Sequence, residues 1–253
     1  MLKARINKKN LTIGSWITLY NESLAEIFAK SGFDWLVIDM EHSAITIDQA
    51  AKLIRVIDLA GCAPLVRLTS NDHNLIKRVM DAGAHGIIVP NINSSDEAKK
   101  AVMATQYAPL GRRGVGLARA QGYGATFDKY FEWQKNEPVV IVQIESKESL
   151  KSLQDIFSVP GVDGFIIGPY DLSSSMGIPG KFSHPDFLNA IDLILSTGKK
   201  CDCSSGTHII EPDHKLLKKA IKQDYKLIAY SVDIRMLDVH ARNSVKLFKE
   251  LIK

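Results

Sequence analysis

Eight short apolar runs, each followed by a segment with helical spacing, constrain the fold of this chain more than any single motif. Runs of this length that are apolar on both faces are typical of buried parallel strands. The predicted strands cover residues 12–19, 35–38, 64–68, 86–89, 139–145, 165–171, 200–203 and 227–230. The predicted helices cover residues 23–31, 47–60, 74–82, 96–105, 147–157, 186–197, 213–223 and 234–252.

Strand and helix that alternate eight times predict an α/β fold: a single (β/α)8 TIM barrel. The 253 residues fit one such domain, with no linker that would divide residues 1–253. The alternative is an open doubly wound sheet, but its glycine-rich dinucleotide turn is missing after the first strand. Residues 107–138 form the one long irregular section. Loops this long in compact domains are usually functional lids, binding loops or disordered segments.

Composition excludes several classes of protein. The net charge of +4 is small and the lysines are scattered, so we expect no nucleic-acid partner. No stretch approaches the roughly twenty apolar residues of a membrane span, and the first nine residues lack the apolar core of a secretory signal. Cys62, Cys201 and Cys203 form an odd set without a second pair for a zinc site, which favours free thiols and a cytoplasmic location.

Polar residues follow the predicted strands where the strands end. Parallel strands in a barrel converge at their carboxyl ends, so these side chains should share one mouth. Glu145 and Asp171, on successive strand ends, could together hold a hard divalent cation, with water and substrate in the remaining positions. The alternative is that both acids cap the helices that follow them. The whole set is Asp39, Glu41, His42, Arg67, Gln143, Glu145, Asp171, Ser231 and Asp233.

Each of the other residues also has a structural interpretation. His42 could be a capping or core histidine, and Arg67 could pair with Asp39 or Glu41 inside the barrel. Asp81 has the pattern of an ordinary exposed helix end. No lysine ends a strand at the mouth, which disfavours a Schiff-base mechanism and leaves metal polarisation of a carbonyl as the alternative.

Six stretches, in order, resemble the metal-dependent pyruvate aldolases of the HpcH/HpaI family. The resemblance runs from Gly14 to about Leu237, and its motifs are specific as a set rather than singly. The stretches are Asp39-Met40-Glu41-His42-Ser43, Pro64-Leu65-Val66-Arg67, Gly86-Ile87-Ile88-Val89-Pro90, Gly111-Arg112-Arg113-Gly114-Val115-Gly116, Gln143-Ile144-Glu145 and Gly168-Pro169-Tyr170-Asp171-Leu172-Ser173.

The resemblance implies a role for each matching residue. Glu145 and Asp171 match metal ligands for Mg²⁺, Mn²⁺ or Co²⁺, and Arg67 matches the arginine that contacts pyruvate and stabilises its enolate. The remaining matches are His42 for proton transfer, Asp81 as its support across a subunit boundary, Gln143 in the pyruvate pocket, and Gly168, Pro169 and Tyr170 beside the substrate carboxylate.

The implied activity is reversible cleavage of a 4-hydroxy-2-oxo acid to pyruvate and an aldehyde through a metal-stabilised enolate. The partners would be these small molecules and further copies of the chain in a hexamer, a trimer of dimers, with the last helix packed on a neighbour. Two departures from the family pattern, Tyr170 and the polar run at residues 204–208, bear on which aldehyde fits. The alternatives are a coenzyme A-thioester lyase, docked by Arg112, Arg113 and Arg119, and a non-catalytic keto-acid-binding barrel.

Overall fold

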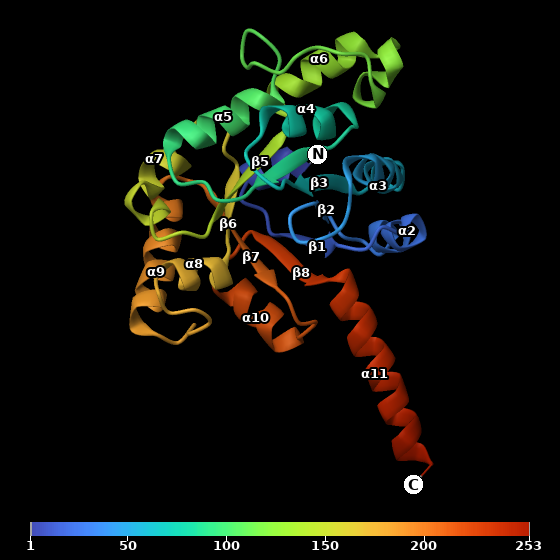
Figure 1. Ribbon diagram of the computed structural model, residues 1–253, viewed down its shortest axis with the longest axis vertical. Coiled ribbons are helices and arrows are strands. Elements are labelled where there is room, and N and C mark those ends of the chain that lie inside the picture. The colour runs from blue at the N-terminus through green and yellow to red at the C-terminus, as the bar shows by residue number, and fades with distance from the viewer. Residues whose placement is uncertain (1, 253) are drawn as a thin grey trace.

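The computed structural model of the chain describes residues 2–252, in which eight parallel strands form a closed barrel in chain order (Figure 1). This confirms the predicted (β/α)8 barrel. The strands are β1 Thr12–Ile17, β2 Trp35–Asp39, β3 Ala63–Arg67, β4 Gly86–Val89, β5 Val139–Ile144, β6 Gly164–Ile167, β7 Ser204–Ile209 and β8 Leu227–Val232.

Helices surround the barrel and link successive strands (Figure 1). The linking helices are α2 Glu22–Lys30, α3 Ile47–Leu59, α4 His73–Asp81, α5 Ser95–Thr105, α6 Phe127–Asn136, α7 Leu153–Phe157, α8 Pro169–Ser175, α9 Pro185–Lys200 and α10 His214–Lys222. Before β1 lies α1 Leu2–Asn7, and after β8 lies α11 Asp233–Leu251; two 3-10 turns, η1 Arg119–Gly124 and η2 Ser149–Lys151, complete the elements.

The strands are buried on both faces because their side chains alternate between two cores. Trp35 and Val37 of β2 belong to the core inside the barrel, whereas Leu36 and Ile38 pack with the helices outside it. Helix α1 closes the amino-terminal end, since its Ile6 is fully buried in the inner core. The carboxyl-terminal end is therefore the open mouth of the barrel.

Two sequence predictions were wrong, one on the start of the seventh strand and one on the section at residues 107–138. β7 begins at Ser204 rather than at residue 200, because Lys200 is the last residue of α9. The strand Ser204–Ile209 is only half-buried, so it lacks the apolar run that marks the others. The section at residues 107–138 is not irregular throughout, because it contains η1 and α6. The buried residues Tyr130 and Gln134 of α6 hydrogen-bond to Arg113 and Tyr107 within the same section.

Helix α11 extends away from the barrel (Figure 1). Its exposed apolar side chains are Ile234, Leu237, Val245, Leu247, Phe248 and Leu251. Between residues 2 and 252, no helix combines the length and the apolar character that crossing a bilayer requires.

Candidate active site at the barrel mouth

A cavity of about 400 Å³ opens at the mouth of the barrel, and both predicted metal ligands line it. Glu145 directly follows β5, and Asp171 lies in the first turn of α8, after β6. The strands are in register here, with Ile144 beside Ile167, so the two acids emerge at the same level. The cavity is lined by Glu41, His42, Asn91, Glu145, Ser146, Asp171, Ser174 and Ser175.

The Glu145 carboxylate is buried and held from both sides. Its Oε1 accepts a hydrogen bond from the backbone N–H of Asn91 at 2.6 Å, and its Oε2 accepts one from Nε2 of Gln143. Asn91 has the left-handed conformation (φ 53°), which asparagine tolerates better than most residues. Neither carboxylate makes a side-chain cap hydrogen bond within the described chain, although Asp171 lies in the first turn of α8, as the capping alternative expects.

Arg67 is fixed beside this cavity by an ion pair with Asp39. Its Nε and Nη2 donate to the two carboxylate oxygens of Asp39 at 2.8 and 2.6 Å, and its Nη1 lies 3.4 Å from Oε2 of Glu41. The guanidinium also covers the ring of Trp16 at 4.3 Å. The contacts with Asp39 and Glu41 restrain the planar Arg67 guanidinium in a single orientation toward the mouth.

Buried polar atoms without a hydrogen-bond partner gather at the mouth. Residues 2–252 contain four such atoms, and three of them belong to Trp16 (Nε1), Glu41 (Oε2) and Gln143 (Oε1). Because leaving a buried polar atom unpaired is costly, such a cluster indicates a site that is completed by a ligand. Burial raises the pKa of Glu41, and the negative charge of Glu145 adds to this, while Arg67 opposes it.

His42 and Asp81 are not brought together within the chain. The His42 side chain is 63% exposed, and its Nε2 lies 3.8 Å from Oε2 of Glu41. Asp81 is the last residue of α4 and accepts a hydrogen bond at 2.6 Å from Nη2 of Arg113. Since helices end near the amino-terminal side of a barrel, Asp81 cannot reach the mouth of its own subunit.

The remaining predicted residues, Gly168, Pro169, Tyr170 and Asp233, differ in their surroundings. Gly168 packs against Glu145, and Tyr170 is 58% exposed with its ring edge-on to Phe182 at 5.0 Å. Pro169 has no N–H, so it cannot donate a hydrogen bond to a carboxylate. Asp233 has a structural role, because it accepts hydrogen bonds from the N–H groups of residues 18, 19 and 234.

Sequence reasoning missed Asn91 and Trp16, two residues that shape this site. Asn91 comes just after Pro90, where the fourth strand was taken to end, so its place after a strand was an available signal. Trp16 lies within β1, a strand whose end carries no residue of the predicted set. The mouth is therefore built from more strands than the sequence motifs indicated.

The donors at the mouth fit a hard divalent cation. Glu145 and Asp171 supply carboxylate oxygens to one cavity, and Oε1 of Gln143 is an unpaired oxygen beside them. Among the residues that the structure describes, no three His, Cys, Asp or Glu side chains form a closed metal cage. Two protein carboxylates that leave positions open for water and substrate suit a catalytic ion.

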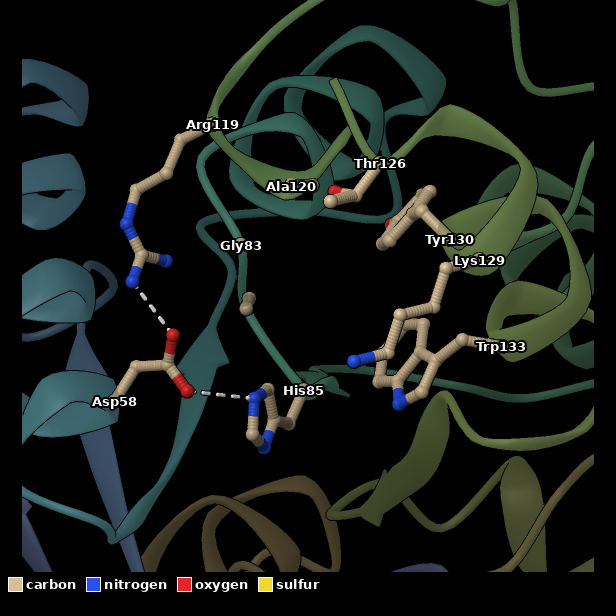
Figure 2. Close-up of a pocket in the computed structure, with 10 residues that line it drawn as sticks. Asp58, Gly83, His85, Arg119, Ala120, Thr126, Lys129, Tyr130 and Trp133 are labelled. Carbon is tan, nitrogen blue, oxygen red and sulfur yellow. Dashed lines mark hydrogen bonds and ion pairs between the residues drawn. The ribbon is translucent and has the colours of Figure 1, made fainter. Parts of the chain in front are cut away.

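A second pocket, of about 350 Å³, is lined by residues of α6 and of the segment before β4 (Figure 2). Asp58 bridges His85, at 3.0 Å, and Arg119, at 2.6 Å, on one side, and Lys129 and Trp133 lie across from them. Its position before β4 and at the end of α3 separates it from the carboxyl ends of the strands, where barrel enzymes carry out chemistry.

Ion pairs and burial engage two of the three arginines proposed for docking a coenzyme A thioester. Arg113 is fully buried and bonded to Asp81 and to the Tyr130 hydroxyl, and Arg119 is paired with Asp58. Of the three arginines proposed for nucleotide docking, only Arg112 is exposed. Of the arginines proposed for it, the thioester alternative therefore retains Arg112 as an exposed cation.

Asp58 is expected to make the stability of the protein depend on pH. Burial acts to raise its pKa, but hydrogen bonds from His85 and Arg119 outweigh burial and leave the pKa below its usual value. A carboxyl with a lowered folded-state pKa stabilises the protein above its unfolded-state pKa, near 4, and loses that contribution as pH falls. We expect Asp58→Asn to cost about 1–2 kcal/mol at pH 7 and less at pH 3.5, measured by urea unfolding at both values. An equal cost at both pH values would contradict this assignment.

Gly168 is expected to control the position of the Glu145 carboxylate. A Cβ at residue 168 would lie 2.7 Å from Oε2 and 2.8 Å from Cβ of Glu145, so the carboxylate would have to move. Because a shift of about 1 Å in a catalytic group can cost about 10²-fold in rate, we expect Gly168→Ala to lower kcat by about that factor. Gly116→Ala is the matched control, since no described atom lies within 4 Å of its added Cβ. Equal kcat values for the two variants would show that Gly168 does not determine the position of the Glu145 carboxylate.

Comparisons with known proteins agree with this site. A model of the HpcH/HpaI aldolase/citrate lyase family matches residues 12–238. A 2-keto-3-deoxy-L-rhamnonate aldolase of Escherichia coli is 32% identical over 249 residues, 98% of this chain and 92% of the relative. A hydroxypyruvate/pyruvate aldolase of Sagittula stellata is 36% identical over 236 residues, 93% of this chain and 92% of the relative. The crystal structure of a protein of the matched family from Burkholderia cenocepacia superposes with a TM-score of 0.92 at 33% identity, covering 98% of both chains.

Proposed function

The chain belongs to the HpcH/HpaI aldolase/citrate lyase family, and from this premise we propose that it is a class II pyruvate aldolase. The enzyme is a carbon–carbon lyase that reversibly cleaves a 4-hydroxy-2-oxo acid to pyruvate and an aldehyde. The observation that carries the proposal is the shared cavity of Glu145 and Asp171, with Arg67 restrained beside it.

Glu145 and Asp171 would hold the divalent ion, for which magnesium, manganese and cobalt are the candidates. Their oxygens are hard donors, and the half-open cavity leaves room for a 2-oxo acid next to them. When bound, such an ion supplies a Lewis acid that polarises the keto group of the substrate.

The side chains of this chain would perform the remaining steps. His42 takes the proton from the C4 hydroxyl, the C3–C4 bond breaks, and its electron pair moves onto the pyruvate fragment as an enolate. Arg67 stabilises the negative charge on the enolate oxygen, because Asp39 holds the guanidinium in place before the charge develops. Protonation at C3 then gives pyruvate. The Gln143 amide, which donates a hydrogen bond to Glu145, orients the 2-oxo acid beside that carboxylate.

A neighbouring copy of the chain would complete the site. Asp81 is remote from His42 in one subunit, so its support of His42 requires an Asp81 from another subunit. The apolar face of α11 offers a surface for such packing, and we propose a hexamer that is a trimer of dimers. We expect Phe248→Asp, at a residue that is 61% exposed, to release smaller species in light scattering, whereas Lys249→Asp on the same helix should not.

The test is a retro-aldol screen with several 4-hydroxy-2-oxo acids, with and without chelator, in which pyruvate release is followed. We expect release that stops with chelator and returns when Mg²⁺, Mn²⁺ or Co²⁺ is added. Exchange of the pyruvate methyl protons in deuterated water checks enolate formation separately. Tight pyruvate binding without exchange or cleavage would instead identify a non-catalytic barrel. A cytoplasmic location remains our expectation from the three free cysteines.

A further inference from the structure

His208 lies on the inner side of β7, close to the proposed active site. The next residue, Ile209, packs outward with Ala220, Tyr225 and Ile228, so strand alternation directs His208 into the barrel. Its ring lies 5.2 Å from the ring of Trp16, and the Arg67 guanidinium covers that same Trp16 ring. His208 therefore lies inside the barrel beside Trp16 and Arg67, on the strand that neighbours β6.

A bulge in β8 determines which nitrogen of His208 carries the proton. The register between β1 and β8 shifts after Gly14, and Ser231 adopts the left-handed conformation (φ 58°). The Ser231 carbonyl oxygen accepts hydrogen bonds from Oγ of Ser15 and from Nε2 of His208, both at 3.3 Å. A carbonyl oxygen can only accept, so Nε2 is the protonated nitrogen and Nδ1 carries the lone pair.

The ring of His208 stays neutral at physiological pH. Burial lowers its pKa to about 4, and the positive charge of Arg67 acts in the same direction, against the hydrogen bond to Ser231. Nδ1 is therefore a permanent hydrogen-bond acceptor, and no side chain or N–H within residues 2–252 donates to it.

The neighbouring ring of Trp16, whose centroid lies 5.2 Å from that of His208, carries an unused donor. Nε1 of Trp16 is buried without any hydrogen-bond partner in the described chain, although the residue is only 2% exposed. A hydroxyl group donates one hydrogen bond and accepts others, so it satisfies both nitrogens at once. A carboxylate would satisfy only Trp16, and an alkyl group would satisfy neither.

We propose that His208 and Trp16 form a subsite for a substrate hydroxyl, which makes His208 a specificity-determining residue for hydroxylated substrates. The inference deepens the proposed aldolase function and rests on it. The hydroxyl belongs either to the donor, as in hydroxypyruvate, or to the aldehyde, as in glycolaldehyde. The chemistry of the subsite is the same for both sources.

Two variants separate this role from a purely structural one. His208→Gln keeps an N–H that can reach the Ser231 carbonyl but removes the acceptor at the Nδ1 position. His208→Asn does the opposite, because its Oδ1 lies near the Nδ1 position and its amide is too short for Ser231. A structural role predicts that Gln is the better replacement, and the subsite predicts that Asn is.

The experiment measures kcat/KM for aldol addition with two matched pairs, hydroxypyruvate against pyruvate and glycolaldehyde against acetaldehyde. We expect the hydroxylated-to-plain ratio in one pair to fall about 3- to 10-fold in His208→Gln and to stay near the parent value in His208→Asn. The affected pair identifies the source of the hydroxyl. An unchanged ratio in His208→Gln, or an equal loss in both variants, would overturn the subsite while leaving the aldolase intact. A parent enzyme that shows neither addition nor exchange of pyruvate methyl protons would refute the aldolase and the subsite together.

Discussion

Replacing Arg67 with alanine is expected to lower kcat for retro-aldol cleavage by about 10²–10³-fold, the usual cost of losing one donor to a developing oxyanion. The guanidinium is restrained by Asp39 and contacts Glu41, which lines the same cavity as Glu145 and Asp171. Its charge is therefore in position before the enolate oxygen becomes negative. Steady-state kinetics of pyruvate release, with saturating metal, measure this effect.

The single variant has a second consequence that must be separated from the first. The Asp39 side chain is only 3% exposed, so removing Arg67 leaves a buried carboxylate without its partner. Breaking a buried ion pair in this way costs about 3–5 kcal/mol of stability. The double variant Arg67→Ala, Asp39→Asn removes both charges, and we expect it to recover much of that stability without recovering kcat.

The double variant makes the role of Arg67 testable even if the single variant fails to fold. A folded double variant that cleaves substrate as fast as the parent would show that the ion pair is structural. Slow cleavage in the folded double variant supports the catalytic assignment. Thermal unfolding of the parent and both variants provides the stability scale for this comparison.

The barrel could be predicted because apolar runs and helical spacing follow directly from burial on two faces. β2, with Trp35 and Val37 inside and Leu36 and Ile38 outside, has no polar position to obscure the signal. The polar residues after the strands could be placed at one mouth for the same reason, since parallel strands end together. Arg67 and Glu145 were found in this way.

Other features depend on tertiary contacts that leave no local pattern. β7 consists of small and polar residues and is identified as a strand only by its pairing with β6 and β8. The bulge at Ser231 follows from the register between β1 and β8, which lie at opposite ends of the sequence. The acceptor on His208 depends on that bulge. The sequence could therefore indicate only that the run at residues 204–208 is unusually polar.

Replacing Glu145 with glutamine is expected to lower the affinity for Mn²⁺ by more than about 10²-fold, because changing an outer-shell partner alone costs 10–100-fold. The variant should still fold. The Gln143 amide, whose Oε1 is unpaired, can rotate to accept from a glutamine at residue 145, and the new carbonyl can accept from Asn91. Titration calorimetry with Mn²⁺ measures the loss, and pyruvate release should fall in parallel.

Glu148→Gln is the matched control for this change, because Glu148 is an exposed acid three residues further along the same segment. It removes the same charge from the same end of the barrel, so it reports any general electrostatic attraction of the cation. Equal losses in the two variants would mean that the cation responds to net charge alone. A loss of more than about 10²-fold that is confined to residue 145 supports direct coordination, because an outer-shell change alone costs 10–100-fold. Coordination there would place a 2-oxo acid between the two carboxylates and Arg67.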